Sequence, residues 1–295
     1  MTPAASEQIA LVTGATSGIG KVTARELVRR GYHVILLARD AAKAARVRQE
    51  LQLLATSGQR VDVLLCDLSD LSQVRRAAEE FTRRYHRLDV LVNNAGLIFG
   101  KERETSTDGY EMTLATNYLG PFLLTGLLLP VLERSEAARI VNVASEGYRL
   151  AKPQLSDLNQ EENYSAWRQY GNTKLYNILF TQELARQLRQ RGITNVVTNS
   201  LHPGVVASSF GAASGGLTSW LTRLAAPLLL TPDEGARTSV FLATDPIGGQ
   251  VSGGYFIKEQ AEPVKHEFTD PVKARQLWQE TERLVGQEFF GEPAA

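Results

Sequence analysis

Tyr170 and Lys174 lie four residues apart in the stretch YGNTK, and their side-chain types suit proton transfer. If the stretch is helical, residues at this spacing project from one face and can share a site. A free phenol, with a pKa of about 10, is a poor base at neutral pH, but a nearby ammonium favours the phenolate and lowers that value. The pair therefore predicts an acid–base tyrosine whose pKa Lys174 lowers. The alternative is a solvent-exposed pair on a helix surface.

A glycine-rich segment near the N-terminus, TGATSGIG, is the second group of residues that could do chemistry. It follows a predicted strand and opens a predicted helix, so its glycines allow a tight turn in which the backbone approaches a pyrophosphate at the helix N-terminus. The spacing G-x-x-x-G-x-G departs from the common G-x-G-x-x-G fingerprint and indicates a narrower group of dinucleotide-binding proteins. The alternative is a glycine turn that binds no ligand. The residues predicted to contact the nucleotide here are Gly14, Thr16, Ser17, Gly18, Ile19 and Gly20.

The end of the second predicted strand carries Ala38 and Arg39. An NAD enzyme normally has Asp or Glu at this place, about 20 residues after the glycine turn, for the ribose 2′-hydroxyl. A guanidinium can instead pair with a 2′-phosphate through two hydrogen bonds. We therefore expect NADP(H) as the cofactor. The alternative is that Arg39 is a solvated surface residue and that Asp40, which also resembles a helix N-cap, binds the ribose.

The elements that must position these residues alternate between two kinds. Short apolar runs, typical of strands buried on both faces, alternate with longer helical patterns, which predicts a parallel sheet covered by helices on both sides. The expected strands are IALVTG, YHVILLA, VDVLLCD, LDVLVNN, RIVNVAS, VVTNSLH and GYFI. The expected helices cover residues 18–30, 41–55, 71–85, 110–133, 167–191, 232–243 and 271–285. No linker or repeat interrupts the alternation, so we expect one α/β domain over residues 1–295.

Two insertions, residues 146–166 and 205–231, follow the carboxyl ends of predicted strands, where open α/β sheets bind their ligands. The second insertion is apolar and could line a pocket for a lipophilic substrate, or could form a lid helix packed on the core or on another subunit. Tyr148 and Trp167 have the same two interpretations. The apolar residues concerned are Leu217, Trp220, Leu221, Leu224, Leu228 and Leu229.

Composition argues against several classes of protein. Basic and acidic residues both total 32, giving a formal net charge of zero, so nucleic acid is not an expected partner. Cys66 is the only cysteine, which excludes an internal disulfide and is compatible with a reducing compartment. The four histidines are scattered without ligand spacing, so no metal site is expected. The N-terminus lacks the pattern of a signal peptide, and the longest apolar stretch, residues 118–132, is shorter than the ~20 residues that span a bilayer. We expect a cytoplasmic protein with no membrane span.

Five motifs together resemble the short-chain dehydrogenase/reductase family over nearly the whole chain. They are TGATSGIG, NNAG at residues 93–96, Ser145 at a strand end, YGNTK, and HPG at residues 202–204. The stretches ATNYLGPFLLT, YGNTKLYNILFTQELARQL, TPDEGARTSVFLATDP and VSGGYF are most similar to the retinol dehydrogenase group and its bacterial relatives. The resemblance implies a Rossmann-type doubly wound sheet of about seven strands, a nicotinamide cofactor, and carbonyl or alcohol substrates. The animal retinol enzymes have a membrane anchor that this sequence lacks, which argues against retinoids themselves as substrates.

The resemblance also assigns roles position by position. Tyr170 and Lys174 count among the cofactor contacts as well as among the catalytic residues. Residues that match the family's other cofactor-binding positions are Asn94, Ala95 and Gly96 beside the adenosine ribose, Asp67 and Leu68 at the adenine, and Pro203, Gly204 and Val205 at the nicotinamide carboxamide. For Asn93 and Asn94, amides that close strand-end backbone groups are a second interpretation that can hold alongside.

The expected reaction is hydride transfer combined with proton transfer. During reduction Tyr170 donates a proton to the carbonyl oxygen, and in the reverse direction it acts as the base. Ser145 hydrogen-bonds the same oxygen and stabilises its charge. Asn117 matches the family position that holds a water in contact with the lysine. Taken singly, Ser145 could be a strand terminator and Asn117 a helix residue satisfied by its own backbone.

Three functional hypotheses follow from the sequence. The first is an NADP(H)-dependent carbonyl reductase or alcohol dehydrogenase with a small-molecule substrate. The second is a carbon–carbon double bond reductase of the same family, and the third is a non-catalytic dinucleotide sensor, which the complete catalytic set disfavours. A homodimer could form through the helices that carry Asn117 and Tyr170, using Leu175, Ile178 and Leu179, although these three residues equally suit burial within one subunit.

Overall fold

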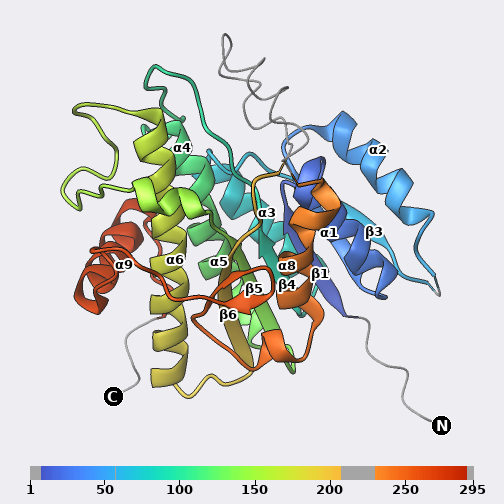
Figure 1. Cartoon of the computed structure of the whole chain (residues 1–295). Helices are drawn as coiled ribbons and strands as arrows, with labels where there is room; N and C mark the ends of the chain where they lie inside the picture. Colours follow the sequence, from blue (N-terminus) through green and yellow to red (C-terminus); the bar gives the residue numbers. More distant parts are fainter. Residues whose placement is uncertain (1–7, 57, 207–229, 291–295) are drawn as a thin grey trace.

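The computed structural model describes residues 8–56, 58–206 and 230–290, which form one eight-stranded sheet with helices on both faces (Figure 1). The strand order is β3-β2-β1-β4-β5-β6-β7-β8. Strands β1 to β7 pair in parallel, and only β8 runs antiparallel to its neighbour. The expected Rossmann-type doubly wound sheet is therefore confirmed. The strands are β1 (Ile9–Thr13), β2 (His33–Ala38), β3 (Val61–Leu65), β4 (Val90–Asn93), β5 (Ala138–Val143), β6 (Val196–His202), β7 (Tyr255–Ile257) and β8 (Gln260–Ala261).

All seven predicted strands are present, and the eighth was missed. Strand β8 is only two residues long and exposed, so it lacks the apolar run by which the other strands were recognised. It follows a turn in which Lys258 and Glu259 have positive φ values of 49° and 66°. Such values are uncommon for residues other than glycine, so nothing in the local sequence signals this turn.

Helices cover both faces of the sheet. Apolar side chains of α1, α2 and α8 pack on one face, and those of α3, α5, α6 and α9 pack on the other. The helices are α1 (Gly18–Arg29), α2 (Ala41–Gln52), α3 (Leu71–Arg84), α4 (Met112–Leu114), α5 (Gly120–Leu132), α6 (Ala166–Gln190), α8 (Pro232–Thr244) and α9 (Pro271–Val285). A π turn, η1 (Ala115–Leu119), joins α4 to α5, and two short 3-10 turns are η2 (Glu146–Leu150) and η5 (Ile247–Gly249).

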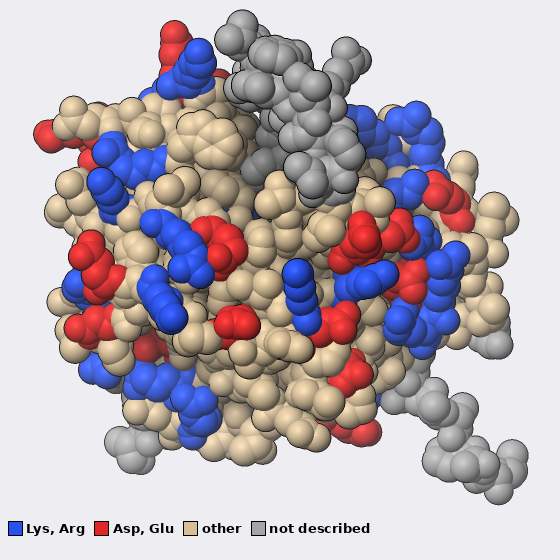
Figure 2. Space-filling view, in the orientation of Figure 1, with Lys and Arg blue, Asp and Glu red and all other residues tan. Residues whose placement is uncertain are grey.

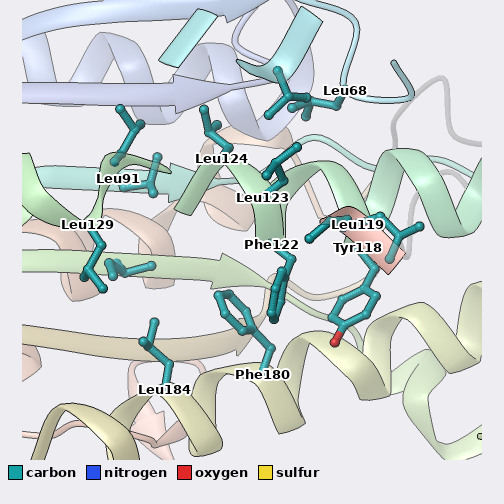
Figure 3. Packing of buried hydrophobic residues seen from close by; sticks show 14 of the residues in the cluster. Leu68, Leu91, Tyr118, Leu119, Phe122, Leu123, Leu124, Leu129, Phe180 and Leu184 are labelled. Carbon is teal, nitrogen blue, oxygen red and sulfur yellow. The ribbon is translucent and has the colours of Figure 1, made fainter. Parts of the chain in front are cut away.

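The larger core lies between the sheet and the α5–α6 layer. Figure 3 shows Phe122 of α5 facing Phe180 of α6, and their ring centroids are 5.1 Å apart. Trp278 of α9 lies 5.1 Å from Phe122 and 5.8 Å from Phe180 between ring centroids, so α9 covers both helices. Leu175, Ile178 and Leu179 are completely buried within the subunit. Of the two interpretations of these residues, dimer contact and internal burial, the structure shows the second.

The helical stretch Met112–Leu132 is the one segment of the described chain that is long and apolar enough to cross a membrane. In the structure 89% of its most apolar window is buried inside the protein. Its apolar length is therefore explained by a central place in the core, where Tyr118, Phe122 and Leu128 have no exposed surface or almost none.

Charged side chains of both signs alternate over the face drawn in Figure 2. Among the described residues, ion pairs join Lys21 to Glu50 at 2.7 Å and Arg149 to Glu146 at 2.7 Å. The view shows no extended patch of one sign, in keeping with the balanced charge of the sequence.

Candidate active site

The β1–α1 turn has the geometry of a close-approach site. Gly14 and Gly18 have positive φ values of 64° and 52°, which favour glycine. A Cβ added to Gly20 would lie 2.3 Å from Asn94 Nδ2 and 2.4 Å from the Gly14 carbonyl oxygen. The glycines therefore let the β1–α1 turn pack directly against the end of β4.

Helix α1 begins without a side-chain cap, whereas α2, α3 and α6 are capped. Ser17 occupies the N-cap position but makes no capping hydrogen bond. By contrast, Asp40, Asp70 and Ser165 each accept a backbone N–H at the start of α2, α3 and α6. Since the first N–H groups of a helix need a partner, those of α1 are left for an anion such as a pyrophosphate. The turn therefore fits the predicted dinucleotide.

Arg39 and Asp40 have different surroundings at the end of β2. Asp40 caps α2 and accepts the Lys43 N–H at 2.9 Å, and this hydrogen bond holds the pKa of the Asp40 carboxyl below its usual value. Arg39 is exposed beyond the sheet edge. The Asp40 carboxylate thus already accepts a hydrogen bond at the start of α2. This favours Arg39 over Asp40 as the residue that would contact the 2′ substituent of the ribose.

The predicted adenine contacts lie at the end of β3. Asp67 Oδ1 accepts hydrogen bonds from the backbone N–H and the hydroxyl of Ser69 at 2.9 and 2.7 Å. Leu68 is buried and belongs to the core shown in Figure 3. Its carbonyl oxygen would lie 2.2 Å from a Cβ at Gly120, so a glycine is needed there for α5 to pack this closely on Leu68.

Asn94 ties the end of β4 to the glycine turn. Its Nδ2 donates to the Thr13 carbonyl at 2.9 Å, and the Thr13 hydroxyl accepts the backbone N–H groups of Asn94 and Ala95 at 2.9 Å each. Asn93 Nδ2 donates to Asn142 Oδ1 on the neighbouring strand at 2.9 Å. Closure of a strand-end backbone group therefore holds for Asn94, whereas Asn93 bonds the side chains of Asn142 and Thr125. The part played by Thr13 was not predicted, because a threonine in an apolar strand carries no distinctive spacing.

Tyr170 and Lys174 project from α6 into the same buried site. Their exposed fractions are 9% and 3%, which excludes the surface-pair interpretation. Lys174 Nζ donates to the Val143 carbonyl at the end of β5 at 2.9 Å and lies 5.5 Å from the centroid of the Tyr170 ring. A Cβ at Gly96 would lie 3.1 Å from Lys174 Nζ, so the ammonium adjoins the β4 end that also contacts the glycine turn.

Ser145 lies beside the Tyr170 hydroxyl. A hydrogen bond with Ser145 favours the ionised phenol. The Ser145 hydroxyl also accepts the Gly147 N–H at 3.1 Å, which starts η2. A Cβ at Gly147 would be 2.9 Å from Tyr170 Cε1, so a glycine is needed there for the ring to approach Ser145. The two predicted donors converge, as expected.

The electrostatics of the site differ from the prediction in one respect. Burial raises the pKa of Tyr170, and the hydrogen bond with Ser145 offsets this only in part. Burial likewise lowers the pKa of Lys174 to about 8. The pKa of Tyr170 is thus raised in the protein alone, although Lys174 was expected to lower it, because the loss of hydration outweighs the hydrogen bond with Ser145.

Asn117 lies in the π turn η1 rather than in regular α-helix. Its side chain accepts the Leu97 N–H at 3.0 Å and donates to the Leu97 carbonyl at 2.9 Å, so it is not satisfied by its own helix. Its main-chain carbonyl accepts Asn177 Nδ2 at 3.0 Å. Residue 121, which would donate to this carbonyl in an α-helix, is Pro121 and has no N–H. That proline was the sequence signal for the irregular turn, and π turns recur at functional sites.

The remaining predicted residues fall into three groups. Pro203, Gly204 and Val205 follow β6 at the same edge of the sheet, and Gly204 has a φ of 87°. Tyr148 is fully buried against Tyr255 and is a core residue, whereas Trp167 is 63% exposed at the start of α6. Residues 207–229 lie outside the described part of the chain, and so do Leu217, Trp220, Leu221, Leu224, Leu228 and Leu229.

Residues 8–215 match the family described as short chain dehydrogenase. Retinol dehydrogenase 14 of Mus musculus is 42% identical over 295 residues, covering 94% of this chain and 85% of that protein. Retinol dehydrogenase 11 of Mus musculus is 39% identical over 279 residues, covering 95% and 86% respectively. Polyprenol dehydrogenase of Homo sapiens is 36% identical, with coverage of 96% and 87%.

Solved structures also resemble the chain over most of its length. A crystal structure of an uncharacterized protein from Mycobacterium Paratuberculosis superposes with a TM-score of 0.76 at 33% identity, covering 97% of this chain and 95% of that one. The Pseudomonas aeruginosa RhlG/NADP active-site complex has a TM-score of 0.67 at 28% identity, with coverage of 84% and 93%. The actinorhodin polyketide ketoreductase with NADPH has a TM-score of 0.66 at 27% identity, with coverage of 84% and 94%.

Proposed function

The chain belongs to the short-chain dehydrogenase family, and from this premise we propose that it is an NADP(H)-dependent oxidoreductase that interconverts a carbonyl compound and its alcohol. The observation that carries the proposal is the convergence of Tyr170, Ser145 and Lys174 in one buried site. This site adjoins the β4 end, which packs on the uncapped glycine turn. The catalytic roles of Tyr170, Ser145, Lys174 and Asn117 belong to the same proposal.

The chain's own residues perform the proton chemistry. A bound nicotinamide dinucleotide supplies or accepts the hydride. Tyr170 donates its proton to the substrate oxygen as that oxygen gains negative charge. Ser145 donates a hydrogen bond to the same oxygen and stabilises its charge. The raised pKa of Tyr170 keeps the phenol protonated at neutral pH, which is the form that donates.

Lys174 and Asn117 hold the geometry around Tyr170. Lys174 is fixed to the Val143 carbonyl, which places a cation beside the phenol in a site that excludes water. Asn117 holds Leu97, one residue after Gly96, and thereby fixes the strand end against Lys174. In the oxidative direction the Lys174 cation would stabilise the phenolate that accepts the substrate proton.

Two observations support NADP(H) over NAD(H). Asp40 caps α2, so Arg39 is the exposed side chain at the position where NAD enzymes carry a carboxylate. In addition, the similar solved structures include complexes with NADP and NADPH.

The names of the relatives support a lipophilic substrate. The curated relatives act, by name, on retinol and on polyprenol, which are both long apolar alcohols. We therefore propose an apolar aldehyde, ketone or alcohol as the substrate class.

A substrate screen tests the proposal. NADPH absorbance is followed with a panel of long-chain aldehydes, aromatic ketones and enones, and products are identified by mass spectrometry and NMR. We expect alcohols from the aldehydes or ketones and a lower KM for NADPH than for NADH. Saturated carbonyl products from the enones would instead identify a carbon–carbon double bond reductase. Failure to oxidise NADPH with every carbonyl tested would contradict the proposed activity.

A further inference from the structure

His202, the last residue of β6, makes a side-chain contact that no catalytic role described above explains. Its Nδ1 accepts the backbone N–H of Glu146 at 3.2 Å. Because the donor is a backbone N–H, Nδ1 must carry no proton, so the imidazole is neutral and protonated at Nε2.

This hydrogen bond joins the segment that follows β5 to the last residue of β6, beyond the point where the two strands stop pairing. The paired register of the two strands ends at Val143 and Leu201, and the Ala144 N–H donates to the Leu201 carbonyl at 2.8 Å. Two residues further along, Glu146 is joined to β6 through the His202 side chain. Ser145 lies between these two attachment points.

The attached segment is the one that carries the proposed oxyanion donor. The Ser145 hydroxyl accepts the Gly147 N–H and is hydrogen-bonded with Tyr170. A change in the Glu146 attachment therefore moves the main chain on the carboxyl side of Ser145, and with it the donor that faces the substrate oxygen.

The charged neighbours of His202 come from two elements, η2 and α6. From η2, Glu146 favours the imidazolium, but its carboxylate is already held by Arg149 Nε at 2.7 Å and by the Tyr255 hydroxyl of β7 at 3.1 Å. From α6, the Lys174 ammonium disfavours the imidazolium. Burial and Lys174 together outweigh Glu146, so the pKa of His202 lies below its usual value.

We propose that His202 is a pH-sensitive positioning residue for Ser145, holding the Ser145–Gly147 turn when neutral and releasing it when protonated. An imidazolium carries N–H groups on both nitrogens, so its Nδ1 would point a donor at the donor of Glu146 and the hydrogen bond would be lost. The inference rests on the proposed function only for its effect on turnover. The release of the turn is a property of the protein alone.

The first test needs no substrate. The backbone amide signals of Glu146 and Gly147 and the ring signals of His202 are followed by NMR between pH 7.5 and pH 5 in the ligand-free protein. We expect the amide signals and the ring to change with one shared midpoint below pH 6.5, the ordinary pKa of histidine. In His202→Asn, whose Oδ1 can accept the same N–H without titrating, the amide signals should stay constant. Amides that ignore the His202 titration would overturn the proposal, even if the enzyme proves active.

The second test uses turnover. As pH falls below the His202 midpoint, kcat of the wild type should fall toward a level about 10²-fold lower, the usual cost of removing one oxyanion donor. His202→Asn should lose this fall of kcat at low pH, the acid limb of the profile. His202→Leu, which has no acceptor, should have a low kcat at every pH. His86→Asn changes an exposed histidine that precedes β4, at the amino-terminal ends of the strands, and should keep the wild-type pH profile of kcat. An acid limb that persists in His202→Asn would refute the assignment. If no carbonyl is reduced at all, the proposed activity fails, and the NMR titration alone decides the role of His202.

Discussion

The ammonium of Lys174 lies 5.5 Å from the centre of the Tyr170 ring, one turn away on the same helix. Both side chains are buried, and burial moves their pKa values in opposite directions, upward for the phenol and downward for the ammonium. Each shift reflects a charged form that has lost its hydration. The site therefore places a neutral phenol close to an ammonium whose proton is held less tightly than usual.

The depressed pKa of Lys174 should make stability rise with pH. Between about pH 8 and pH 10.5 the unfolded chain still binds the lysine proton while the folded protein has released it, so unfolding becomes less favourable as pH increases. From pH 7 to pH 10 this group should add about 2–3 kcal/mol to the free energy of unfolding, at about 1.4 kcal/mol per pKa unit. Urea denaturation at several pH values measures it.

Lys174→Met supplies the comparison for the pH measurement. The variant has no titrating group at this position. The free energy of unfolding of the wild type, relative to that of the variant, should therefore rise by the same 2–3 kcal/mol over this range. Tyrosines with raised pKa values affect both proteins equally and cancel in the difference. A difference that is independent of pH would show that the Lys174 pKa is not depressed.

Arg39→Ala should weaken NADP(H) selectively. Loss of a charge-assisted contact with the 2′-phosphate costs about 1.5–3 kcal/mol, which corresponds to an increase in KM for NADPH of about tenfold to 100-fold with little change for NADH. Steady-state kinetics with both dinucleotides measure the effect. Arg46→Ala, an exposed arginine on α2, is the matched control. Equal losses for NADPH and NADH in the Arg39 variant would leave the Asp40 alternative standing.

Gly20→Ala should damage both the fold and dinucleotide binding. The new methyl group would approach Asn94 Nδ2 and the Gly14 carbonyl to within 2.4 Å, so β4 and the glycine turn must move apart. Such overpacking costs about 1–3 kcal/mol. Gly100→Ala is a suitable control, because a Cβ there meets only Glu104 Oε1 at 3.6 Å. Urea midpoints and dinucleotide titrations that are the same for both variants would be incompatible with the close packing described.

Much of the architecture could be predicted from the sequence, because seven strands carry long apolar runs with helical patterns between them. The sites that depended on spacing along one element, such as Tyr170 with Lys174 and the β1–α1 glycines, were also predictable. The capping role of Asp40 was visible from its position before an alanine-rich helix, and the structure bears it out.

Features that depend on contacts between distant segments were not predictable. The attachment of Glu146 to His202 spans 56 residues, and that of Asn94 to Thr13 spans 81. The Tyr170 pKa went against the prediction because the sequence identifies the neighbouring charge but not the extent of burial. The π turn at Asn117 was missed although Pro121 signalled it, because the long apolar pattern around it is typical of a regular helix.

The central claim is that the Tyr170 hydroxyl moves the proton, and two tyrosines on α6 allow a matched measurement. Tyr176 is completely buried, and its hydroxyl has no hydrogen-bond partner. Removing the hydroxyl by Tyr176→Phe should therefore leave kcat almost unchanged, whereas Tyr170→Phe should lower kcat by about 10²–10⁴-fold, the usual contribution of a general acid. Dinucleotide affinity, followed by fluorescence titration, should stay within a fewfold of wild type in both. Turnover near the wild-type level in Tyr170→Phe would contradict the account.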